Sequence, residues 1–128
     1  MSENEIGKLI LDAAIVVHRE LGPALLESVY ETVLAYELQQ LGLRVNRQVP
    51  IAIRYKDMIF DAAFRADLVV EEKVLVELKS VEQISEAHKK QVQTYLRLRG
   101  YKLGFLLNFG EALMKRGITR VVNGLEDD

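Results

Sequence analysis

The sequence contains no cysteine and no tryptophan, and only two of its 128 residues are proline. Without cysteine, disulfide bonds, thiolate catalysis and cysteine-ligated zinc are excluded. No apolar run approaches the roughly 20 residues that a membrane-spanning helix needs. Residues 1–5 are acidic and lack the basic flank and apolar run of a signal peptide. We therefore expect no membrane association and a cytoplasmic location.

A strong positive charge is also missing, because 17 basic and 19 acidic residues leave a net charge of −2. Proteins that bind nucleic acid without sequence preference are usually basic, since neutralised phosphates supply most of the affinity. Tight, sequence-independent DNA binding by an isolated monomer is therefore not expected. A metal-bridged active site needs only a local positive surface, so a metal-dependent nuclease is not excluded.

The length suits one compact domain with a single hydrophobic core. Hydrophobic residues make up 49% and charged residues 28% of the chain, which is ordinary for a globular protein. We predict a single domain over residues 1–128, with a helical pair at 5–41, a sheet and core helix at 44–122, and an acidic tail at 123–128.

Apolar residues spaced three and four positions apart predict two N-terminal helices. The first covers residues 5–20 and ends at Gly22-Pro23. The second covers about residues 25–41 and ends at Gly42. Its predicted buried stripe consists of Leu26, Val29, Tyr30, Val33, Leu34, Leu38 and Leu41.

After the helical pair, apolar residues recur at every second position, which is typical of strands. The clearest strand is 74–79, where β-branched residues are frequent. The element order ααβββαβ(β) predicts an α/β (α+β) fold with a mixed central sheet flanked by helices. The elements expected after the helical pair are strands at 44–55 and 58–70 joined by a turn at Lys56-Asp57, the strand 74–79, a helix at 85–99 N-capped by Ser85, and strands at 101–108 and 117–122.

Three charged side chains are predicted to share one face of a β-hairpin. Glu77 and Lys79 lie two positions apart on one strand and therefore point to the same side. If Val70 pairs with Val74, Asp67 lies opposite Glu77, with the two Cβ atoms about 4.5–5.5 Å apart. A slip of one residue would separate the two acids. The three residues of the intervening turn include neither Gly nor Asn, which such turns favour.

Facing carboxylates repel each other, so in an apolar setting they favour a proton or a metal ion. Mg²⁺ or Mn²⁺ takes oxygen ligands and can lower the pKa of a bound water to give a nucleophile. Lys79 could orient that water or stabilise charge on the phosphorane. Asp67, Glu77 and Lys79 therefore predict a metal-dependent phosphodiesterase site. The alternative is a solvated strand face with a weak ion pair.

Five segments together resemble the GxxExxY proteins, a small bacterial and archaeal family of the PD-(D/E)XK nuclease-like superfamily. The resemblance covers about residues 5–122. One departure is that the motif's glycine falls at Ala24, which leaves Ala24-x-x-Glu27-x-x-Tyr30. The segments are Leu21–Tyr30 (LGPALLESVY), Arg65–Asp67 (RAD), Val76–Lys79 (VELK), Gln91 with Tyr95 and Leu96, and Gly104–Gly110 (GFLLNFG).

The resemblance implies a PD-(D/E)XK restriction-endonuclease-like core and a Mg²⁺- or Mn²⁺-dependent nuclease that acts on DNA or RNA. Asp67, Glu77 and Lys79 match the D…ExK motif. Glu27 matches the acidic residue of the first core helix and is a candidate metal ligand. Gln91 matches a polar position on the helix after the third strand and could bond the carboxylates or water.

Three further residues are candidates for substrate binding. Arg65 lies one pleat from Asp67 on the same side and could contact a phosphate, as could His88. Tyr30 could hydrogen-bond to Glu27 or belong to the core.

A different class of function stays open beside the nuclease. The chain could be a catalytically silent nuclease-fold module that binds nucleic acid or a protein partner. The low net charge and small size favour it, and they also suggest that a homodimer or a protein partner completes the substrate groove. A purely structural subunit with a stabilising charge network is a third hypothesis.

Overall fold

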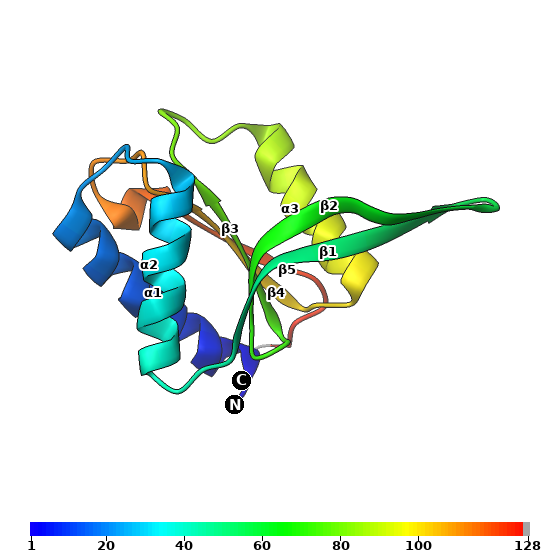
Figure 1. Cartoon of the computed structure of the whole chain (residues 1–128), viewed down its shortest axis with the longest axis horizontal. Coiled ribbons are helices and arrows are strands. Elements are labelled where there is room, and N and C mark those ends of the chain that lie inside the picture. The colour runs from blue at the N-terminus through cyan, green and yellow to red at the C-terminus, as the bar shows by residue number, and fades with distance from the viewer. Residues whose placement is uncertain (127–128) are drawn as a thin grey trace.

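The computed structural model describes residues 1–126, so the last two residues of the predicted acidic tail lie outside it. The element order confirms the α/β fold predicted from the sequence (Figure 1). None of the described helices is long and apolar enough to cross a bilayer. In chain order the elements are α1 (Glu3–Leu21), α2 (Glu27–Gln40), β1 (Val45–Tyr55), β2 (Met58–Val70), β3 (Val74–Lys79), α3 (Glu86–Arg99), β4 (Leu103–Asn108), the 3₁₀ helix η1 (Met114–Gly117) and β5 (Ile118–Val122).

The five strands form one mixed sheet in the order β1-β2-β3-β4-β5. Only the β3–β4 pair is parallel, and α3 supplies the crossover that a parallel pair requires. Helices α1 and α2 cover one face of the sheet and α3 covers the other (Figure 1). Each face therefore has its own apolar core, the larger beneath α1 and α2.

Local sequence signals account for where the helices α1 and α3 begin. The Ser2 side chain accepts a hydrogen bond from the amide of Glu5, whose own side chain bonds back to Ser2. Ser85 caps α3 as predicted, by accepting from the amide of His88 at 3.2 Å. The His88 ring in turn accepts from the Ser85 amide at 3.1 Å. Side chains thus satisfy amides that the first turns leave free.

The buried face of α2 differs from the predicted one. The prediction was wrong for Leu26, Val29 and Leu41, which are exposed. The helix carries apolar residues on more than one side, so spacing alone does not select the face that packs on the sheet. The observed stripe is rotated and includes an acid: the buried residues are Tyr30, Glu31, Leu34, Ala35 and Leu38.

Strands β1 and β2 continue as a two-stranded ribbon far beyond the body of the molecule (Figure 1). Strand β2 pairs with β3 over three positions only, from Leu68 opposite Val76 to Val70 opposite Val74. The predicted register of this hairpin is therefore confirmed. Residues 49–66, the part of the ribbon that is not paired with β3, are named the arm.

The turn between β2 and β3 lacks the glycine or asparagine that its backbone favours. Glu71 and Glu72 both adopt left-handed conformations, with φ of 53° and 56°. Hydrogen bonds to the backbone of Arg44 hold Glu71 in place: its amide donates to the Arg44 carbonyl at 2.8 Å, and its carboxylate accepts from the Arg44 amide at 2.6 Å. These contacts compensate for the unfavourable backbone angle.

Replacing Ala24 with glycine should stabilise the protein. Ala24 lies between α1 and α2 with φ of 66°, and its amide donates to the Phe109 carbonyl at 3.1 Å. A residue with a Cβ is strained in this left-handed region, whereas glycine is not. We expect Ala24→Gly to raise the free energy of unfolding by about 1 kcal/mol, measured by urea denaturation. The control Ala87→Gly, in the first turn of α3, should lower it by up to about 1 kcal/mol.

Candidate active site

The two predicted acids meet where β2 parts from β3. The amide of Asp67 donates to Oε1 of Glu77 at 3.0 Å, and the amide of Leu78 donates to Oδ2 of Asp67 at 2.8 Å. The carboxylates therefore satisfy two backbone amides near the point where the regular strand pairing stops. This reciprocal arrangement fixes both acidic side chains side by side on neighbouring strands.

Burial shifts the pKa values of both acids upward, and a neighbouring negative charge adds to each shift. Glu77 is only 9% exposed, and burial, followed by the negative charge of Asp67, raises its pKa to about 8. Burial also raises the pKa of Asp67, although its hydrogen bond from the Leu78 amide opposes the shift. Because the two sites titrate together, the pair favours sharing a proton near neutral pH or attracting a cation.

Lys79 supplies the positive charge beside the two acids. It is half-buried at the end of β3, two positions from Glu77, and its charge lowers the pKa of both Asp67 and Glu77. Its carbonyl accepts a hydrogen bond from the Phe109 amide at 2.8 Å. The backbone of Lys79 is therefore fixed at the end of β3, and strand alternation puts its side chain on the same face as Glu77.

Asn108 positions the chain that leaves β3 after Lys79. It is fully buried opposite Lys79 on β4. Its Oδ1 accepts from the amides of Val81 and Gly110, at 3.1 and 3.0 Å, while its Nδ2 donates to the Val81 carbonyl at 2.9 Å. A Cβ at Gly110 would collide with the backbone of Val81. Asn108 and Gly110 thus hold the loop that follows β3 against the loop that follows β4, beside the site.

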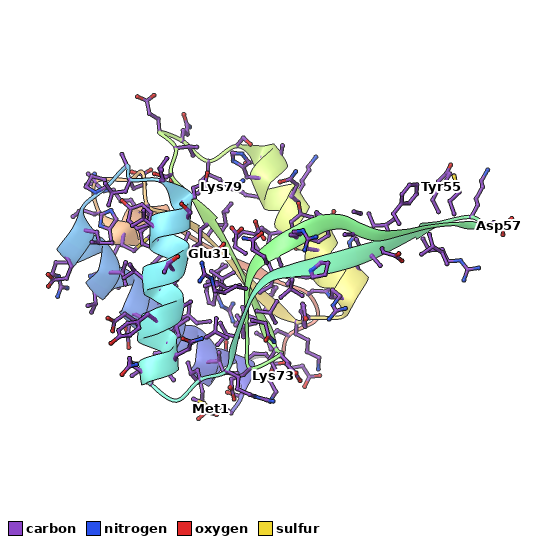
Figure 2. All side chains as sticks on the ribbon, viewed as in Figure 1. Met1, Glu31, Tyr55, Asp57, Lys73 and Lys79 are labelled. Atoms are coloured by element: carbon purple, nitrogen blue, oxygen red, sulfur yellow. The ribbon has the colours of Figure 1, made fainter. Side chains whose placement is uncertain are left out.

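Two residues that the sequence did not single out join the acids. Glu31 is buried on the side of α2 that faces the sheet (Figure 2). The side-chain nitrogen Nε2 of Gln48 donates to Oε1 of Glu31 and to Oδ1 of Asp67, the latter at 3.2 Å. Arg47 forms an ion pair with Glu31 at 2.8 Å. Glu31 lies next to Tyr30 and one turn before Leu34 in the sequence, so its position among apolar residues could have indicated a buried acid. No local sequence feature indicates the role of Gln48.

Gln48 is also conformationally unusual, because it has φ of 52° in the middle of β1. A non-glycine residue in this region is strained and persists only where its surroundings hold it. Here its side-chain amide lies between two acids on separate elements, Glu31 on α2 and Asp67 on β2. The strain is therefore associated with the placement of a donor between these carboxylates.

Removing this donor should destabilise the protein. We expect Gln48→Ala to lower the free energy of unfolding by about 1–3 kcal/mol, because Glu31, which is buried, and Asp67 would each lose a hydrogen bond. The matched variant Gln91→Ala removes an exposed glutamine and should change stability by less than about 0.5 kcal/mol. Urea denaturation at neutral pH compares the two, and equal effects would contradict the structural role of Gln48.

The structure does not bring every sequence-predicted residue to the carboxylates. Glu27 is the exposed first residue of α2, one helical turn before Glu31. Gln91 is exposed on α3. Within residues 1–126, neither side chain hydrogen-bonds to Asp67 or Glu77.

The three predicted substrate-binding residues lie in different settings. Tyr30 is fully buried, and its hydroxyl donates to the Gly22 carbonyl at 2.6 Å, which gives it a packing role in the turn between α1 and α2. His88 is half-buried and bonds to Ser85 at the start of α3. Arg65 is exposed on the arm, beside the acids in sequence, and remains available to solvent.

Tyr95 on α3 extends the site beyond the predicted set. Burial, followed by the charges of Glu77 and Asp67, raises the pKa of Tyr95. Its ring stacks on Phe64 of the arm, with centroids 3.3 Å apart. Tyr95 and Phe64 therefore link the arm to α3 close to the acids, as an aromatic boundary of the site.

The acids suit a hard divalent cation, although no group of three or more acidic or histidine side chains in the described part of the chain is arranged to hold one. Asp67 and Glu77 supply only oxygen ligands, and each carboxylate retains acceptor capacity beyond its hydrogen bonds, two for Asp67 and one for Glu77. Mg²⁺ commonly binds through one or two carboxylates and keeps several waters. The residues present therefore fit such an ion.

A family profile described as the PD-(D/E)XK nuclease superfamily matches residues 4–121, which is most of the sequence. The chain belongs to the PD-(D/E)XK nuclease superfamily. Its two N-terminal helices, mixed five-stranded sheet and crossover helix are consistent with the superfamily fold. The superfamily typically uses divalent metals, and membership implies nucleic acid as the partner. Searches of curated proteins and of solved structures gave no match.

Proposed function

We propose that this chain is a divalent-metal-dependent nuclease that hydrolyses phosphodiester bonds of nucleic acid. The observation that carries the proposal is the pair formed by half-buried Asp67 and buried Glu77, held by reciprocal hydrogen bonds on neighbouring strands of a superfamily fold. Two neighbouring acids with raised pKa values, one of them buried, are a costly arrangement that a bound cation would relieve.

Asp67 and Glu77 would hold Mg²⁺ or Mn²⁺. Such an ion, when bound, polarises a phosphoryl oxygen and lowers the pKa of its bound water. Lys79 shares the face of Glu77 and is only half-buried, so its ammonium group can reach a substrate or a water. In this proposal Lys79 orients the attacking water and stabilises negative charge as it develops on the phosphoryl group.

The surrounding residues position this core. The side-chain amide of Gln48 bridges Glu31 and Asp67 by donating a hydrogen bond to each carboxylate. Glu27 lies one turn before Glu31 at the exposed start of α2, and Gln91 is exposed on α3, so both would act from the substrate side. Arg65 is the proposed phosphate contact, because it is exposed and two residues from Asp67.

We further propose that the chain belongs to the GxxExxY family within the superfamily. The motif's glycine falls at Ala24, and Ala24 adopts a left-handed φ of 66°, where glycine is the residue without strain. Tyr30 of the same motif closes this turn through its bond to Gly22. The backbone thus supports the motif assignment even though the glycine itself is replaced.

A silent nuclease-fold module that binds nucleic acid or a protein is the second candidate function. It is favoured by the lack, among residues 1–126, of three acidic or histidine side chains placed to hold a metal, together with the net charge of −2. Cleavage separates the two candidates, because a silent module binds its partner without hydrolysing it.

The proposal is tested by incubating the protein with labelled single- and double-stranded DNA and RNA in Mg²⁺, Mn²⁺ or a chelator. We expect metal-dependent cleavage of at least one polymer, and a loss of at least about a hundredfold in Asp67→Asn. Asp61→Asn, which changes an exposed acid of the arm, is the matched control and should retain activity. Cleavage by none of these combinations, or equal rates in Asp67→Asn and wild type, would refute the proposal.

A further inference from the structure

The tip of the arm presents one wholly apolar face. Cross-strand pairing places Ile53 opposite Phe60 and Tyr55 opposite Met58, so these four side chains share one side of the ribbon. Tyr55, Met58 and Phe60 are each more than half exposed. Figure 2 shows Tyr55 and Asp57 at the far end of the ribbon, away from the body of the molecule. This face has no cover from the chain's own core.

A two-stranded ribbon is marginally stable in water without further packing. The base of the arm meets this need, because Ile51, Phe64 and Ala66 join the core beneath α3. The tip does not, since it carries large exposed apolar side chains on a projecting element. The tip therefore has the properties of a surface that packs on another molecule.

Helix α2 carries a second uncovered apolar surface. Leu26, its N-cap residue, is 75% exposed, and Tyr36 is 56% exposed. Val29, which is 38% exposed, and Val33, which is partly buried against the core, lie between them at spacings that put all four on one side of the helix. A helix that is apolar on both its buried and its outer side is typical of an element covered on both sides.

The two surfaces differ in charge, because α2 is acidic and the arm has no excess of acid. Within α2 there is no lysine or arginine, and the acids Glu27 and Glu37 form no ion pair among residues 1–126. The arm carries more bases than acids. Its charged residues are Arg54, Lys56 and Arg65, against Asp57 and Asp61.

We propose that the arm of one copy of this chain lies along α2 of a second copy, and reciprocally, in a two-fold symmetric dimer. The arm points away from the α2 of its own chain, so the two surfaces meet only between copies (Figure 1). Two-fold symmetry forms both contacts at once, which is how most homodimers close. This inference concerns assembly and is independent of the proposed nuclease activity.

The area of the two surfaces supports a stable dimer. Taking about 150–250 Å² for a whole large apolar side chain, their exposed parts together offer about 700 Å² per copy. Reciprocal packing would therefore bury about 1,400 Å² in total, within the range of about 1,200–2,000 Å² for stable interfaces. Contact between two arm faces alone would bury only about half as much and falls short of that range.

Nucleic acid suits these surfaces less well. Affinity for nucleic acid comes mainly from basic groups that neutralise phosphates, whereas the exposed face of the arm tip consists of apolar side chains. The acids of α2 would repel the same phosphates. A second copy of the chain fits both surfaces and leaves Arg65, nearer the acidic pair, for a substrate.

The absence of cysteine allows a direct test by disulfide trapping. Full-length Tyr55→Cys and Tyr36→Cys proteins are mixed and oxidised in air. The proposal predicts a disulfide that joins one chain of each kind, because Tyr55 of the arm would lie near Tyr36 of the other copy's α2. Mixing Tyr55→Cys with Leu98→Cys, which is exposed on α3, should give no such product. If two Tyr55→Cys chains form a disulfide with each other in preference to the mixed product, the proposal is overturned in favour of contact between two arms.

Sedimentation of wild type and of folded surface variants gives the second measurement. The wild type should sediment as a dimer, and Tyr55→Ser/Phe60→Ser should raise the dimer dissociation constant at least about tenfold. Ile59→Ser is the matched control, because Ile59 is exposed on the opposite face of the same arm and should change the constant little. A wild type that is monomeric at every concentration overturns the proposal, as does an equal effect of the two changes. Weakened DNA binding in a monomeric double variant would assign the arm to nucleic acid instead.

Discussion

Replacing Lys79 with methionine is expected to lower the rate of phosphodiester cleavage about 10²–10³-fold, the usual effect of removing one electrostatic group aimed at the transition state. Methionine keeps an unbranched side chain at this half-buried position on β3 but carries no charge. The acids Asp67 and Glu77 would remain in place, so metal affinity should not fall. Initial rates measured at saturating Mn²⁺, with Mn²⁺ affinity measured in parallel, separate the two effects.

The control for this variant is Lys102→Met, which changes an exposed lysine just before β4. It should cleave at the wild-type rate. If Lys79→Met retained full activity, Lys79 would not be the group that stabilises the reacting phosphate. If it lost activity only together with metal affinity, its role would be to organise the acids.

Replacing Glu77 with glutamine is expected to stabilise the metal-free protein at high pH. Burial and the charge of Asp67 raise the pKa of Glu77 from 4.5 to about 8, so the folded state holds a proton that the unfolded state has lost between these values. The contribution of Glu77 to stability is therefore greatest below about pH 4.5 and falls as pH rises towards 8. The expected slope is on the order of 1 kcal/mol per pH unit in the presence of a chelator.

Glu77→Gln removes this titration and should make the pH profile much flatter, with the variant more stable than wild type by on the order of a few kcal/mol at pH about 8. Adding Mg²⁺ should restore the stability of wild type at that pH and leave the variant unchanged, since the ion binds only the folded wild type. Urea denaturation across pH, with the exposed-acid variant Glu82→Gln as control, gives the comparison. Parallel profiles for wild type and Glu77→Gln would contradict the assignment of the shift to Glu77.

Much of the fold could be predicted from the sequence because its signals are local. Strands β2 and β3 begin and end at the predicted residues, 58–70 and 74–79, and the register that places Val70 opposite Val74 is the observed one. Helix α3 starts after its predicted cap, Ser85. In each case the ends or the register of the element follow from alternation, spacing or a capping side chain within a few residues.

The face of α2 could not be predicted in the same way. Its apolar residues lie on two sides, and the choice between them depends on packing against strands that follow later in the chain. Glu31 is therefore buried although it is charged, because Arg47 and Gln48 of β1 approach it. Such partners are fixed by tertiary contacts and leave no trace in the spacing of the helix.

The candidate site, like the fold, could be predicted only in part from the sequence. Strand alternation was enough to group Asp67, Glu77 and Lys79. It did not reveal that β2 leaves β3 at this position, which turns the two carboxylates onto backbone amides. Nor could it reveal Gln48, whose position depends on a left-handed backbone angle within a strand.

Binding of Mn²⁺, measured by calorimetry at pH about 8, where deprotonation of Glu77 favours the ion, tests the central claim most directly. We predict that the wild type binds Mn²⁺ and that Asp67→Asn/Glu77→Gln does not, while the paired exposed-acid variant Asp61→Asn/Glu82→Gln binds as wild type does. The absence of Mn²⁺ binding by the wild type at millimolar concentration would contradict the account, and so would equal affinity in the double variant of the site.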